Sequence, residues 1–257
     1  MKLYNDLTQS QKKRIWTIGF GGLLKIASKT LPIGFADWLM AECYDADSSE
    51  LVFPSRGRIL VNADLACRAF GLPNNGDEVK YELDVGAINF INGEYGIDEG
   101  TSPTIDSILE RLKENKTSND DFLRSWLMIV IPTFLCPPTG LAISPRCYPA
   151  IVDLSCVKKL NWCQFVVDQL KDAVAKMGKR RSFKGCLLVL VVNCFASCSM
   201  LQCLVSATAA AVATMPLQQA LSISAIINLS HICFYFFILF SYVLMPSLIF
   251  HLCRFYM

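Results

Sequence analysis

Histidine is almost absent from this chain. Only two occur among the 257 residues, His231 and His251, and both lie beyond residue 230. A serine or cysteine nucleophile of the common hydrolytic kind needs an imidazole beside it as general base. We therefore expect no hydrolase of that kind in residues 1–184, where no imidazole is present.

Charge is missing from one long stretch of the sequence. All 22 acidic residues and 23 of the 24 basic ones lie at or before Lys184, and residues 185–253 contain none. The net charge of +2 gives no general attraction to nucleic acid, although a local basic patch would still allow it. We therefore divide the chain into a polar and apolar body, 1–184, and an uncharged hydrophobic tail, 185–257.

Cysteine pairs with the spacing of a metal site are also missing. The chain has 12 cysteines but no C-x-x-C pair, and no histidine follows the closely spaced Cys194, Cys198 and Cys203 at ligand distance. The N-terminus lacks the apolar run of a signal peptide, so an oxidising compartment is not expected. We predict reduced, packed thiols and no structural zinc site.

The segment AFGLPNNGDEV carries Gly71 and Gly76 at the spacing of a phosphate-binding loop. Such a loop continues with Lys and Ser or Thr, whereas Asp77 and Glu78 follow here, and their carboxylates would repel a phosphate. The segment instead predicts a helix that ends at Gly71 and continues into a turn. No catalytic, cofactor or metal site is predicted, and we expect no enzyme.

The periodicity of the body predicts a mainly α-helical domain with one small β-hairpin at about residues 51–61. Asn62, Thr104 and Asn119 are positioned to cap helices, and residues 120–136 read as a buried core helix. Residues 84–102, rich in Gly and Asn, are expected to be mostly loop, with AINFI at 87–91 as a candidate for a short buried turn. The aromatic residues expected to hold the core are Trp38, Phe70, Trp126 and Trp162.

Two apolar segments of the tail are candidate membrane helices. The segment at about 225–250 is long enough to span the hydrocarbon core, and a second, at about 187–209, is diluted by polar residues. The alternative for the second is a core helix of a soluble domain. A basic flank precedes both and predicts a cytosolic body under the positive-inside rule. Its members are Lys176, Lys179, Arg180, Arg181 and Lys184.

Three stretches of the body resemble the plant mobile domain, also called aminotransferase-like, a family of transposon-derived plant proteins. They are residues 51–79, which end their helix with Gly71, Leu72 and Pro73, residues 120–170, and residues 184–192. The second stretch contains the family-motif residues Arg124, Ser125, Trp126 and Leu127. The similarity covers about residues 20–192 and is strongest to grass members that precede a SUMO-protease-like domain.

This resemblance implies a mobile-element origin, a mainly helical module with no established reaction, and a role in the nucleus. The sequence departs from the family after residue 192, where apolar residues replace the polar sequence that follows in the family. We therefore expect a truncated, non-enzymatic interaction module whose tail anchors it in a lipid bilayer, with an unknown protein partner. The alternatives are a nuclear factor that contacts nucleic acid through the basic flank, and a non-functional remnant of a protease-linked mobile element.

Overall fold

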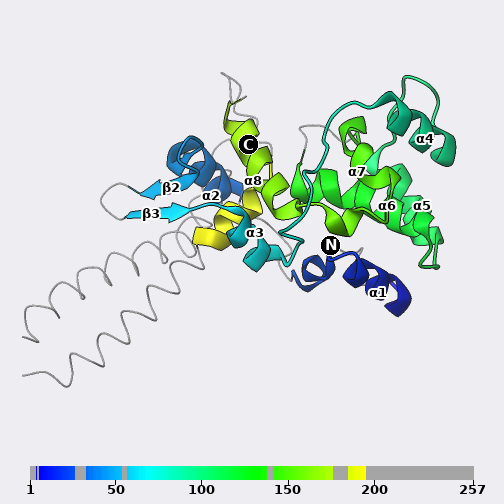
Figure 1. Cartoon of the computed structure of the whole chain (residues 1–257), viewed down its shortest axis with the longest axis horizontal. Coiled ribbons are helices and arrows are strands. Elements are labelled where there is room, and N and C mark those ends of the chain that lie inside the picture. The colour runs from blue at the N-terminus through cyan, green and yellow to red at the C-terminus, as the bar shows by residue number, and fades with distance from the viewer. Residues whose placement is uncertain are drawn as a thin grey trace, which may run out of the picture. The chain divides into compact units, whose positions relative to one another are not determined.

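The computed structural model describes residues 4, 6–26, 33–53, 57–137, 142–175 and 185–194 (Figure 1). The chain divides into two units, Met1–Phe195 and Ala196–Met257, and every described residue belongs to the first. The predicted basic flank, Lys176 to Lys184, lies outside the described residues, as does the predicted membrane segment at about 225–250. Both therefore remain predictions.

The first unit is mainly helical, as the sequence predicts. Its longest described helix is α8 (Trp162–Ala175), and most of α6 (Asp120–Val130) is buried. The other α-helices are α1 (Gln9–Thr17), α2 (Ile33–Trp38), α3 (Ala63–Phe70), α4 (Val85–Tyr95), α5 (Ile105–Glu114) and α7 (Pro149–Val152). Single turns of 3₁₀- or π-helix connect them: η1 (Gly21–Lys25), η2 (Leu39–Cys43), η3 (Ile131–Leu135), η4 (Pro145–Cys147) and η5 (Val157–Lys159).

Three helix starts are confirmed at the predicted capping residues. Asn62 Oδ1 accepts from the Leu65 amide at 3.0 Å, Thr104 Oγ1 from Ser107 at 3.1 Å, and Asn119 Oδ1 from Phe122 at 2.9 Å. Each side chain satisfies an amide that has no partner within the helix. The predicted end of α3 is confirmed too, since Gly71 adopts the left-handed conformation that closes it, at φ 61°.

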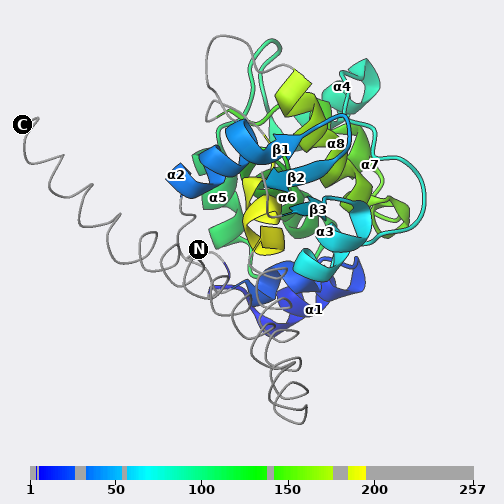
Figure 2. The same ribbon diagram turned by 90° about the vertical axis from the view of Figure 1, so that its left-hand side faces the viewer.

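The small sheet has three strands rather than the predicted hairpin of two. Strands β1 (Tyr44–Asp45), β2 (Glu50–Phe53) and β3 (Gly57–Leu60) pair antiparallel in sequence order and lie side by side in Figure 2. Leu51, fully buried, pairs with Tyr44 on one side and Ile59 on the other. Strand β1 was missed because two residues are too few to reveal an alternating pattern.

The expectation of a loop over most of residues 84–102 is wrong, because α4 occupies the first half of that range. Asp84 caps the helix by accepting from the Ala87 amide at 2.7 Å, and Gly96 closes it at φ 61°. Only Ala87 and Ile91 are buried, so the apolar period is short. Contacts with α7 stabilise a segment whose glycine and asparagine content argues against a helix.

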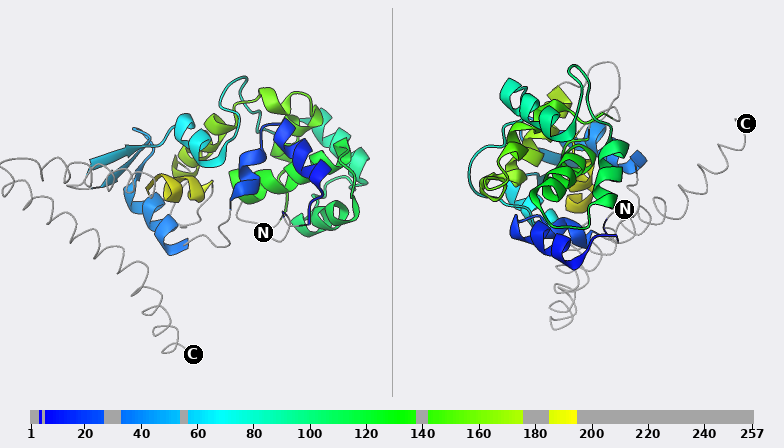
Figure 3. Two further views of the ribbon diagram at one scale, coloured as in Figure 1. Left: turned by 90° about the horizontal axis from the view of Figure 1, so that it is seen from below. Right: turned by 90° about the vertical axis from the view of Figure 1, so that its right-hand side faces the viewer.

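The core is built around α6, whose residues from Phe122 to Val130 are all buried, as predicted for this segment. Phe20 joins the two central tryptophans, with ring centroids 5.8 Å from Trp126 and 5.2 Å from Trp162, both edge-to-face. Figure 3 shows the dark blue α1 beside the green α6. Trp38 is not a core residue as expected: it is 38% exposed and stacks on Phe35 near the sheet.

Residues 187–194 form a helix that belongs to the first unit. Val189 and Leu190 are fully buried and Asn193 is 1% exposed. This is the beginning of the predicted membrane segment at about 187–209, and here its apolar residues pack against protein. Within the described part of the chain, no helix combines the length and apolar character needed to cross a bilayer.

Candidate functional site

The family-motif residues Gly71, Leu72 and Pro73 hold the end of α3 against the start of α8. A methyl group on Gly22 would lie 1.9 Å from the Phe70 carbonyl oxygen, so the two backbones touch at a point that only glycine permits. The Leu72 carbonyl accepts from Cys163 Sγ at 3.3 Å, and the Pro73 carbonyl accepts from the Cys163 amide at 3.1 Å. These contacts are structural.

Arg124, the first residue of the second motif, connects α6 to the segment around α7. Its guanidinium is buried and donates to the carbonyl oxygens of Ile151 at 3.3 Å and Val152 at 3.4 Å. The same group lies 5.1 Å from the centre of the Phe90 ring, on α4. The charge is therefore occupied by internal contacts rather than presented to a ligand.

The other motif residues on α6 are also committed to packing. Ser125 is buried and its hydroxyl shares a hydrogen bond of 2.9 Å with the Tyr95 hydroxyl at the end of α4. Trp126 and Leu127 are fully buried. The motif thus joins α4, α6 and α7 and forms no open site.

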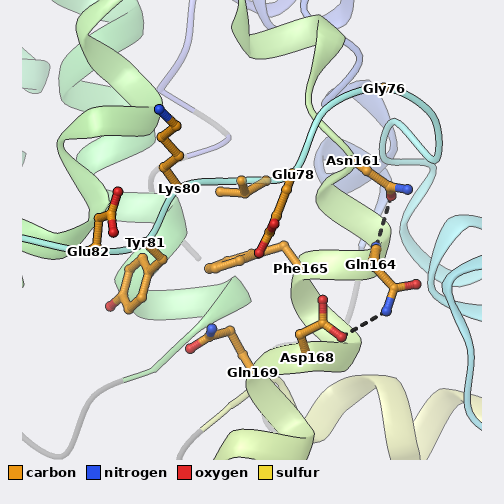
Figure 4. A pocket seen from close by; sticks show the side chains of 11 residues that line it. Gly76, Glu78, Lys80, Tyr81, Glu82, Asn161, Gln164, Phe165, Asp168 and Gln169 are labelled. Carbon is orange, nitrogen blue, oxygen red and sulfur yellow. Dashed lines mark hydrogen bonds between the residues drawn. The ribbon is translucent and has the colours of Figure 1, made fainter.

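An open cavity of about 630 Å³ lies elsewhere, between the irregular segment 76–82 and α8 (Figure 4). The segment is fixed to the residues before α8 by two backbone bonds: Asp77 N–H donates to the Lys159 carbonyl at 2.9 Å, and Asn161 N–H donates to the Asp77 carbonyl at 2.8 Å. A methyl group on Gly76 would lie 1.8 Å from the Lys159 oxygen. The second glycine of the G-x-x-x-x-G spacing therefore serves this close approach.

Both polar and aromatic side chains line the cavity. Among the described residues, three carboxylates and one ammonium group line it, and two rings, Tyr81 and Phe165, lie 5.4 Å apart between centroids. On α8, Gln164 Nε2 donates to Asp168 Oδ1 at 2.8 Å, which fixes that carboxylate. The full lining is Gly76, Glu78, Val79, Lys80, Tyr81, Glu82, Asn161, Gln164, Phe165, Asp168 and Gln169.

A family model described as a domain of unknown function, DUF8566, matches residues 1–191. The chain belongs to this family. No similar curated protein and no similar solved structure was found. The matched region includes the whole lining of the cavity and all of the motif residues on α3 and α6.

Three buried thiols of the DUF8566 body are poor nucleophiles. Burial raises the pKa of Cys147 and of Cys186 to about 12, and burial together with the nearby Glu42 raises that of Cys43 to about 11. A thiol reacts as its thiolate, and these groups are protonated at neutral pH. Within the described ranges, no group of three or more potential metal ligands is close enough to hold an ion.

Sequence reasoning missed the cavity, although one pattern pointed to it. Residues 78–82 read Glu-Val-Lys-Tyr-Glu, an alternation typical of an extended segment with one buried side. Val79 is buried and Glu78, Lys80 and Glu82 are exposed, as that alternation predicts. Asp168, which lines the cavity from α8, had no such signal.

Proposed function

We propose that this DUF8566 chain is a non-enzymatic interaction module that its C-terminal tail holds at a membrane. The observation that carries the proposal is the open, charged cavity beside α8, because its carboxylates are in none of the ion pairs formed between described residues. Three buried polar side chains, by contrast, are used internally: Arg124, Ser125 and Gln11 all bond to neighbouring segments. A cavity with available charge suits recognition of another molecule.

The chemistry of the body supports binding rather than catalysis. Residues 1–184 contain no histidine, and the buried thiols are protonated at neutral pH. A general base near neutral pH and an activated nucleophile are both without a candidate in the described body. Turnover of any ester, peptide or nucleotide by the purified chain would contradict this part of the proposal.

The membrane tether rests on the tail sequence. The segment at about 225–250 is uncharged and long enough to span a bilayer, and the basic flank before the tail favours a cytosolic body. Because residues 187–194 pack into the first unit, the tether is assigned to the later segment. Carbonate extraction tests it: the full chain should remain in the membrane pellet, and residues 1–195 should be released.

A nuclear role is the second candidate, and the acid-free basic cluster is the observation that favours it. Lys179, Arg180, Arg181 and Lys184 would contact phosphates, in keeping with the resemblance to the plant mobile domain. DNA binding by residues 1–195 should then weaken steeply as salt rises, and replacement of these four residues by glutamine should remove it. Binding that is absent or independent of salt rejects this role.

A further inference from the structure

The charge balance of the cavity favours a cationic ligand. Among the described residues, Glu78, Glu82 and Asp168 line it together with a single ammonium group, Lys80. Figure 4 shows the Lys80 side chain pointing away from Phe165, whereas Glu78 reaches toward that ring. A cation entering beside the ring would therefore meet carboxylates first.

The aromatic residues of the cavity suit the same kind of ligand. Phe165 is held edge-to-face against Trp162, with centroids 5.8 Å apart, and with 5% of its surface exposed it forms a fixed part of the cavity wall. Tyr81 lies beside it from the opposite segment. Ring faces attract lysine and arginine head groups, and they also cover the aliphatic stems of those side chains.

The main chain beside the cavity is open to a partner. Asp77 uses both its N–H and its carbonyl in bonds to the residues before α8, but no hydrogen bond joins the backbone of residues 78–82 to any described residue. Extended backbone with unpaired groups is the feature that an incoming peptide uses when it adds a strand. A small amine has no backbone and would not pair with the N–H and carbonyl groups of residues 78–82.

We propose that the cavity between residues 76–82 and α8 binds an extended peptide segment of a partner protein through a lysine or arginine side chain. This inference rests on the proposed interaction role and specifies its site and ligand. The basic side chain lies between Glu78 and Asp168 against the ring of Phe165, and the peptide backbone pairs with residues 78–82. A volume of about 630 Å³ accommodates one such side chain with its neighbouring backbone.

The test measures peptide binding by fluorescence anisotropy with the full chain, purified in a mild detergent. The probes are fluorescein-labelled pentapeptides of alanine and threonine with a central lysine, arginine or norleucine. We expect saturable binding of the lysine and arginine peptides and roughly tenfold weaker binding of the norleucine peptide, because the cation is removed without loss of stem length. Methylation of the backbone nitrogens beside the central residue should also weaken binding.

Charge variants identify the site. Asp168→Asn keeps an oxygen for the Gln164 amide and removes the charge, so the fold should persist and affinity should fall roughly tenfold. Asp47→Asn, on an exposed turn away from the cavity, is the matched control and should bind as the wild type does. Glu78→Gln and its exposed control Glu99→Gln form a second pair with the same expectation.

Each contrary result overturns the inference. Equal affinity for the norleucine peptide would show that the positive charge is not recognised. Unchanged affinity of Asp168→Asn and Glu78→Gln would show that the peptide binds elsewhere. Competition by n-butylamine as effective as that by the lysine peptide would leave a small-amine site in place of the peptide site. The chain could resist carbonate extraction and show no turnover, yet bind none of the peptides. That result would agree with the proposed function but would reject the peptide site.

Discussion

At the scale of single residues, buried polar side chains of the DUF8566 body connect segments that are distant in sequence. Gln11, on α1, is 1% exposed, and its amide nitrogen donates to the carbonyls of Asn115 at 2.8 Å and Thr117 at 3.0 Å. Arg124 does the same between α6 and the region of α7. Each of these side chains donates to backbone oxygens that would otherwise be buried without a donor. Leaving such an oxygen unpaired costs more free energy than the hydrogen bond itself contributes.

Replacement of Arg124 by methionine should therefore destabilise the body. The variant keeps most of the aliphatic stem but leaves the Ile151 and Val152 carbonyls without their donor. We expect the free energy of unfolding to fall by roughly 1–3 kcal/mol, measured by urea denaturation of residues 1–195. Arg146→Met, at an exposed position on η4, is the control and should change it by no more than about 0.5 kcal/mol. An equal effect of the two variants would show that the hydrogen bonds of Arg124 do not stabilise the body.

Buried thiols make the stability of the body sensitive to alkaline pH. Burial raises the pKa of Cys147 and Cys186 from 9.0 to about 12, so an unfolded thiol ionises while a folded one stays protonated. The stabilisation is complete below pH 9 and is lost as the pH rises from about 9 toward about 12. Each thiol should lower the free energy of unfolding by on the order of 1 kcal/mol per pH unit in that window.

Urea denaturation of residues 1–195 at pH 8, 9 and 10 measures this slope. Cys147→Ser removes one titrating group, so its stability should decline less steeply above pH 9 than that of the wild type, whatever its absolute value. Parallel slopes for the two proteins would show that the Cys147 thiol does not contribute.

At the scale of elements, three helices could be predicted from their capping side chains, whereas α4, whose sequence has poor helix propensity, could not. Asn62, Thr104 and Asn119 mark helix starts by their own chemistry. The cap of α4, Asp84, precedes a segment whose two buried positions, Ala87 and Ile91, give almost no period. Its helical state depends on contacts with α7, which local sequence does not encode.

Two glycine variants of α4 should have opposite effects. Gly93 lies inside the helix, and a methyl group there would meet no atom within 4 Å, so Gly93→Ala should stabilise the body by roughly 0.5–1 kcal/mol. Gly96→Ala also meets no atom, but its φ of 61° is left-handed, and we expect a loss of roughly 1 kcal/mol. Thermal denaturation of the two variants measures whether each change raises or lowers stability. Higher stability of Gly96→Ala would contradict the left-handed end of α4.

At the scale of the whole molecule, the cavity shows what sequence reasoning could reach and what it could not. The alternation of residues 78–82 is local and readable, and so is the face of α8. Their juxtaposition depends on the close contact of Gly76 with Lys159, 83 positions further along the chain, and on the bonds of Asp77 that fix it. Pairings of this range arise only when the core has formed, so the site could not be assembled from periodicity.

The boundary between body and tail is also decided by tertiary packing. Charge alone places it after Lys184, but Val189 and Leu190 are fully buried in the first unit. Burial of two such side chains contributes roughly 3–6 kcal/mol, comparable with the whole stability of a small domain. A fragment that ends at residue 184 should therefore fold poorly, whereas one that ends at residue 195 retains these contacts.

Comparison of residues 1–184 with residues 1–195 tests this directly. We expect the longer fragment to unfold cooperatively in urea with dispersed amide signals in its NMR spectrum, and the shorter one to lose several kcal/mol of stability or to aggregate. Val189→Ala in the longer fragment should cost roughly 1–3 kcal/mol, since it removes buried methyl groups from a position that is 0% exposed. If residues 1–184 were as stable as residues 1–195, the helix at 187–194 would contribute nothing to the core. The start of the segment at about 187–209 would then be available to the membrane.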